Sequence, residues 1–148
     1  MPVHKERAEY KPNKLYKQSK SGISLVYMTI DNHENAKRFS KKLFSKGLIA
    51  QAELESSSME RSYLMFGSAH TNKDQVRLVL TTSDDRIKEL VDFTNQNSPV
   101  LYDYPVQDII TEPVNTGDDD YINWVKKQTG KDQSFKYTDD SDAVEPKK

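Results

Sequence analysis

The sequence has no cysteine, five glycines and a single tryptophan among its 148 residues. Without thiols the chain has no disulfide, no thiolate metal ligand and no cysteine nucleophile. No apolar run approaches the roughly 18 residues that a membrane helix needs, and the N-terminus lacks a secretory hydrophobic segment. These absences predict a protein without a membrane span, and a cytoplasmic location is the simplest expectation.

Charge of neither sign is in large excess. The chain has 22 basic and 23 acidic residues and a formal net charge of -1. Nucleic-acid binders normally carry a basic excess or a basic stripe, so we expect no nucleic-acid partner. The first twenty residues are locally basic, and such an arm can contact an acidic protein partner or a membrane surface, although a solvated tail explains it more simply.

Hydrophobic residues make up 34% of the chain and are concentrated in its middle. A core is expected only there, and the length suits one domain. The sequence therefore predicts a basic N-terminal arm over residues 1–21, one folded domain over 22–128 and a polar C-terminal tail over 129–148.

The first half of the domain reads as a strand, a helix and a hairpin. Residues 23–30 are apolar on both faces, which predicts a central strand. Asp31, three residues before Glu34, predicts a helix start, and Gly47 predicts its end. Ala36, Phe39, Leu43 and Phe44 form its apolar stripe. Residues 48–66 alternate around a bend or bulge in the serine run 56–58, with a polar loop over 67–74 and a strand over 75–82.

The second half reads as a helix, a strand and a helix. Thr82 or Ser83 is expected to cap a helix that ends at Ser98-Pro99, with an inward stripe of Ile87, Leu90, Val91 and Thr94. Residues 106–112 are expected as the last strand, followed by a turn at Pro113 and Gly117. The third helix starts at the aspartates 118–120, ends near Lys126 and Lys127, and is expected to pack through Tyr121, Trp124 and Val125.

This order predicts an α+β fold, the ferredoxin-like βαββαβ sandwich with an antiparallel sheet and a C-terminal helix. Right-handed crossovers would place both main helices on one face of the sheet. The opposite face would then need cover, and self-association is an economical way to provide it.

Four ordered segments resemble the CutA, or divalent-cation tolerance, family over about residues 22–128. They are MTIDNHENA (28–36), KGLIAQAEL (46–54), YDYPVQDI (102–109) and PVNTGDDDYINWV (113–125). The resemblance implies a homotrimer that shares strands across subunit edges and takes part in divalent metal ion binding or the response to metal ions, copper above all. A divalent cation is the one cofactor that it implies.

The chain departs from that family at metal-binding positions. Gln51 stands where the family has a cysteine, and Tyr102 stands where it has a histidine. A soft-metal site built on cysteine and histidine is therefore degenerate here.

The resemblance also points to a ligand cleft between subunits, onto which Tyr104 and Asp108 fall. Asp31, His33 and Glu34 could form a hard-cation site, although a capped, exposed helix start explains them more simply. Tyr121 and Trp124 are expected in packing or trimer contacts.

No catalytic motif is present, and the sequence predicts a protein that is not an enzyme. An RNA-recognition domain shares the element order, but the strand QVRLVLTT has no aromatic residue. An acylphosphatase would need an arginine-containing phosphate loop, which is missing. Two functions are carried forward: a trimeric CutA-like protein of the metal-ion response, and a structural subunit that uses this scaffold and its tails to assemble a larger complex.

Overall fold

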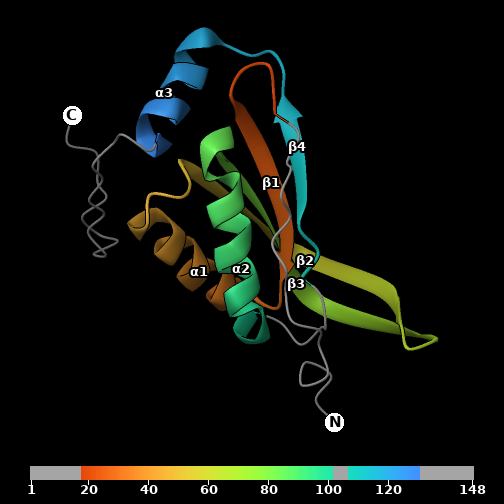
Figure 1. Cartoon of the computed structure of the whole chain (residues 1–148). Helices are drawn as coiled ribbons and strands as arrows, with labels where there is room; N and C mark the ends of the chain where they lie inside the picture. The colour runs from red at the N-terminus through yellow and green to blue at the C-terminus, as the bar shows by residue number, and fades with distance from the viewer. Residues whose placement is uncertain (1–17, 102–106, 131–148) are drawn as a thin grey trace.

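The computed structural model describes residues 18–101 and 107–130, apart from the side chains at 56–59, 65 and 98–101. Two long helices lie against one face of a four-stranded sheet, and a third helix packs at its end (Figure 1). The elements are β1 (Ile23–Ile30), α1 (His33–Ser45), β2 (Gln51–Met65), β3 (Ser68–Ser83), α2 (Ile87–Leu101), β4 (Ile110–Val114) and α3 (Asp119–Thr129).

The sheet has the strand order β2-β3-β1-β4, and the neighbouring strands are antiparallel. This order is that of the ferredoxin-like sandwich, so the predicted fold class is confirmed. Tyr27, in the central strand β1, pairs with Val79 on one side and Ile110 on the other. The long strand β2 and the short strand β4 are the two edges.

The core lies between the sheet and the two long helices. Val26, Met28 and Ile30 alternate along β1 and pack in the same cluster as helix residues Phe39 and Leu90. Every residue of the expected α2 stripe is buried, and so are the α1 positions Ala36, Phe39 and Leu43. Gly47 follows α1 with a φ of 69°, as expected for a left-handed helix end.

The β2–β3 hairpin is longer than the sequence predicts. The polar loop expected over 67–74 is wrong, because β3 begins at Ser68 and the turn consists of Phe66 and Gly67. Their φ values of 52° and 79° suit a two-residue hairpin turn. The polar residues 68–74 belong to a two-stranded ribbon that projects beyond the helices (Figure 1). Both faces of the ribbon are exposed to solvent, so its sequence shows no alternation of apolar and polar residues. The irregularity expected near residues 56–58 is confirmed by register shifts between Glu55 and Arg61.

Two other expected boundaries are wrong. α2 runs through Pro99 to Leu101; a proline removes one helical hydrogen bond and kinks a helix without always stopping it. β4 spans Ile110–Val114 rather than 106–112, and Val106 lies outside the described residues. Pro113 belongs to β4 and not to a turn, because an edge strand tolerates a missing amide donor.

Candidate functional site

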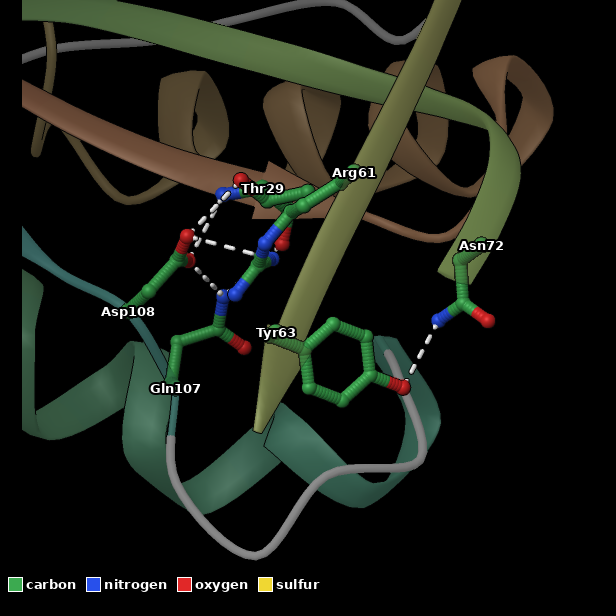
Figure 2. Close-up of polar contacts among 6 residues, drawn as sticks. All are labelled: Thr29, Arg61, Tyr63, Asn72, Gln107 and Asp108. Atoms are coloured by element: carbon green, nitrogen blue, oxygen red, sulfur yellow. Dashed lines mark hydrogen bonds and ion pairs between the residues drawn. The ribbon is translucent and has the colours of Figure 1, made fainter. Parts of the chain in front are cut away.

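Asp108 lies just before β4 and fastens that segment to the end of β1. Its Oδ1 accepts a hydrogen bond of 2.9 Å from the Thr29 backbone N–H. Its Oδ2 accepts one of 2.8 Å from the Thr29 hydroxyl. Figure 2 shows the carboxylate turned toward Thr29, with Arg61 reaching it from β2. One carboxylate therefore positions the chain where it enters the edge strand.

Gln107 strengthens the same attachment from a buried position. Its Nε2 donates to the Thr29 carbonyl oxygen at 2.9 Å and to Asp108 Oδ1 at 3.3 Å. The residue is 5% exposed, and its Oε1 is buried without a hydrogen-bond partner. Gln107 and Asp108 together hold both backbone groups of Thr29.

The hairpin supplies the positive charge of the cluster. Arg61 Nη1 lies 3.3 Å from Asp108 Oδ2, and the two side chains are 23% and 33% exposed. The Arg61 guanidinium also lies over the Tyr63 ring, 5.4 Å from its centroid. The Tyr63 hydroxyl accepts from Asn72 Nδ2 at 3.1 Å, which ties both hairpin strands to the cluster (Figure 2). The register shifts before Arg61 bend β2 and change the direction of its following residues.

A divalent metal does not fit these residues. An ionised carboxylate offers about four acceptor positions, and Asp108 already meets two donors at Oδ1 and two at Oδ2. The adjacent Arg61 charge repels a cation and favours a polar or anionic neighbour. Within the described ranges, no three histidine, aspartate or glutamate residues gather where they could hold a metal ion. The cluster is built to position strands.

The candidates at the start of α1 are placed differently from the prediction. The helix N-cap is Asn32, whose Oδ1 accepts from the Asn35 N–H at 2.8 Å, so the capping role given to Asp31 is wrong. The side chain of Asn32, one residue after Asp31, is the one that reaches the unpaired backbone N–H in the first turn of the helix. His33 and Glu34 are exposed in the first turn, and Glu34 lies 3.9 Å from Arg38.

Tyr104 lies outside the described residues, so its pairing with Asp108 stays a prediction. The sequence did not point to Thr29, Arg61 or Gln107. Two features of the sequence could have indicated these residues. Arg61 lies in the alternating segment 59–66, and Gln107 lies beside Asp108.

The sequence predicted that Tyr121 and Trp124 pack inward, and this prediction is wrong. They are 39% and 42% exposed and stack on each other with ring centroids 5.8 Å apart. The buried face of α3 is instead formed by Ile122, Val125 and Thr129. The Tyr121 hydroxyl donates to Gln51 Oε1 at 3.0 Å, so the residue at the family's cysteine position holds the aromatic pair in place.

The open sheet face carries a second polar contact, between Tyr27 and Glu112. The Tyr27 hydroxyl donates to Glu112 Oε1 at 2.6 Å. This hydrogen bond, with burial as a smaller cause, raises the pKa of Tyr27 above its ordinary value of 10.0. The folded protein therefore holds the phenol proton more tightly, and the resulting stability is present below pH 10 and lost as the pH rises through the raised pKa.

We expect Glu112→Gln to lower the Tyr27 pKa toward 10.0. The neutral amide removes the charge that disfavours the phenolate. The measurement is an alkaline NMR titration of ring-labelled tyrosine, with Tyr27→Phe to assign the signal. An unchanged Tyr27 titration in the variant would refute the assignment of this contact.

Comparison with known proteins decides the family. The family model described as CutA1 divalent ion tolerance protein matches residues 24–128. The chain belongs to this family. The CutA1 match covers the elements from β1 to α3, apart from the first residue of β1 and the last residue of α3, and confirms the resemblance drawn from the four segments.

Solved CutA1 structures share the fold. That from Ehrlichia chaffeensis is 28% identical, with a TM-score of 0.64, and the match covers 74% of this chain and 96% of that one. CutA1 from Pyrococcus horikoshii is 29% identical with a TM-score of 0.63, over 73% and 99% of the two chains. Both relatives are matched almost end to end by the CutA1 region of this chain.

The curated relatives are plant proteins. The chloroplastic CutA protein of Arabidopsis thaliana is 25% identical over 105 residues, which are 71% of this chain and 54% of that protein. The chain thus spans about half the length of the curated relatives that it matches. In the portions that the structure describes, no helix is both long and apolar enough to cross a membrane. The cytoplasmic location stays a prediction.

Proposed function

We propose that this chain is a non-enzymatic, homotrimeric CutA-family protein that serves in the response to divalent metal ions without the family's cysteine-and-histidine metal site. The family match supports the role in metal response. Gln51 and Tyr102 replace the soft ligands that the resemblance implies, and donors already fill the Asp108 carboxylate.

Self-association is the part of the proposal that the geometry supports best. In the part of the chain that the structure describes, β2 and β4 are the sheet edges, and each has one row of backbone groups that no described strand pairs with. Ile110, in β4, is 60% exposed, while Leu64 and Phe66 at the hairpin end are 79% and 77% exposed. Apolar side chains beside two free edges favour partners that are further copies of the chain. This combination is the observation that carries the proposal.

Ile110→Lys should lower the mass of the protein in solution from that of a trimer toward that of a monomer. A lysine on an edge strand opposes pairing with another chain, and the exposed position makes little difference to the monomer fold. Light scattering after size-exclusion chromatography measures the mass. Gln96→Lys, on the exposed side of α2, is the matched control and should leave the mass unchanged. A trimer that persists in Ile110→Lys would count against β4 as a subunit contact.

Titration with copper or zinc tests the metal part of the proposal. We expect no calorimetric heat from stoichiometric binding at micromolar metal, because the described residues lack a donor set for either ion. Asp108→Asn and His33→Gln should titrate like the unchanged protein. Tight binding at one metal per chain that is lost in either variant would contradict the proposal and place the site.

A structural role in a larger complex is the second candidate. The exposed Tyr121–Trp124 pair favours it, because large aromatic side chains held in one orientation are typical of contact centres between proteins. Tyr121→Ala with Trp124→Ala should then release a protein partner while the trimer mass stays the same. If both the mass and the partners are unchanged, this candidate fails.

A further inference from the structure

The outer face of α1 carries a concentration of positive charge. Residues 33–46 contain one acidic side chain, Glu34, and five basic ones, namely Lys37, Arg38, Lys41, Lys42 and Lys46. Lys37 and Lys41, Arg38 and Lys42, and Lys42 and Lys46 are each four residues apart. Like charges at this spacing destabilise a helix by a small amount, so an anion at this face would stabilise it.

Among the described residues, only Arg38 and Lys46 have a partner that offsets their charge, and that of Lys46 is the Phe93 ring, whose centroid lies 5.0 Å from Lys46 Nζ. Glu34 lies 3.9 Å from Arg38, and no acidic group of the described ranges lies within ion-pair distance of Lys37, Lys41 or Lys42. The neighbouring helix α2 has acidic residues that are already paired: Asp92 Oδ2 with Lys88 at 3.1 Å, and Glu89 Oε1 with Arg86 at 2.7 Å. An acidic partner for the α1 face would therefore come from outside the described residues.

The chain leaves the described region close to the end of α1. Thr129, the last residue of α3, bonds to Ser83 through its hydroxyl. The preceding residue of β3, Thr82, donates through its hydroxyl to the carbonyl oxygen of Leu48 at 2.7 Å. Leu48 stands two residues after the α1 C-cap, Lys46. Figure 1 likewise draws the end of α3 beside the connection from α1 to β2.

The sequence beyond this point holds the complementary charge. Residues 139–145, DDSDAVE, contain four acidic side chains and no basic one. The nine Cα-to-Cα steps from Gly130 to Asp139 can span about 30 Å when extended, and α1, a helix of 13 residues, is about 20 Å long. The acidic segment can therefore reach every basic side chain on the α1 face.

We propose that the acidic segment 139–145 docks on the basic face of α1 in the same chain. Four carboxylates then meet Lys37, Lys41 and Lys42, which have no acidic partner in the described region. The contact is electrostatic, because the apolar side of α1 is already packed in the core. The segment thus acts as an internal competitor for any anionic partner that approaches α1. This inference does not depend on the proposed metal-response function.

Zero-length carbodiimide cross-linking of the full chain, mapped by mass spectrometry, tests the proposal. Amide bonds should form between Lys37, Lys41 or Lys42 and the carboxylates of 139–145. Their yield should fall at least about fivefold in 1 M salt, where charges are screened beyond about 3 Å. The triple variant Lys37→Glu, Lys41→Glu, Lys42→Glu should lose these cross-links. Adding Asp139→Lys, Asp140→Lys and Asp142→Lys should restore them with the charges exchanged.

Two controls make the result decisive. Glutamates in place of Lys5, Lys11 and Lys14 in the N-terminal arm should leave the cross-links unchanged, because that arm is the other basic segment of the chain. A mixture of isotope-labelled and unlabelled protein should give cross-links within one chain. Cross-links of 139–145 to the N-terminal lysines, cross-links only between different chains, or yields that are unchanged in 1 M salt would each overturn the proposal.

Discussion

Leu78→Ala should lower the free energy of unfolding by about 2–5 kcal/mol. Leu78 is 0% exposed and lies in β3 within the cluster formed by the sheet and both long helices. The truncation removes buried methyl groups and leaves a cavity that the neighbouring side chains fill only in part. Urea denaturation at one fixed protein concentration measures the change, since association adds to the apparent stability.

Gln96→Ala is the control for this experiment. Gln96 lies on the exposed side of α2, away from the sheet edges that we propose as subunit contacts. The truncation there should alter the free energy of unfolding by no more than about 0.5 kcal/mol. Equal losses in the two variants would mean that Leu78 is not part of the core.

Asp108→Asn should lower the free energy of unfolding by about 2 kcal/mol. The amide nitrogen would face the donors of Thr29 or Arg61, so at least one hydrogen bond and the ion pair between Asp108 and Arg61 are lost. This loss of stability is smaller than that of a broken buried ion pair, which is typically about 3–5 kcal/mol. The reason is that the Arg61 and Asp108 side chains are 23% and 33% exposed, so water screens their charges.

A double-mutant cycle isolates the Asp108–Arg61 contact. Arg61→Gln should destabilise the parent protein more than it destabilises Asp108→Asn, because the ion pair is already absent in the variant. The control is Glu55→Gln on the same hairpin, where Glu55 lies 3.9 Å from Arg77 and both side chains are largely exposed. That change should stay within about 0.5 kcal/mol. Strictly additive effects of Asp108→Asn and Arg61→Gln would refute the contact.

The Asp108 cluster bears on assembly through the strands that it positions. It ties Thr29 in β1, the approach to β4 and the hairpin strand β2 to one another. These strands provide the two free edges that we propose as subunit contacts. A loss of the cluster should therefore weaken self-association as well as stability.

Sequence patterns located the buried elements well and the polar ones poorly. Residues 23–30 are apolar on both faces, and this pattern matched β1 to the residue. The hairpin end was misread, because a ribbon that is exposed on both faces shows no alternation, as in residues 68–74. The alternation of apolar and polar residues indicates a strand only where one of its faces is buried.

α3 shows a limit of a different kind. Val125 belongs both to the stripe of Tyr121 and Trp124 and to the stripe of Ile122 and Thr129, so helical spacing alone could not choose the buried side. In the folded protein Ile122 and Val125 pack against Ile23 at the start of β1, and this contact makes the Ile122 side of α3 the buried one. The CutA resemblance found Asp108, but Arg61 stands 47 positions earlier in the chain, and only the fold brings the two together.

The mass of the purified full-length protein in solution tests the central claim, that this CutA1 chain works as a homotrimer. Light scattering at micromolar concentration should give about 51 kDa, three times the 17.1 kDa of one chain. A mass of 17.1 kDa throughout that range would contradict the account, because the free edges β2 and β4 would then have no partner copy.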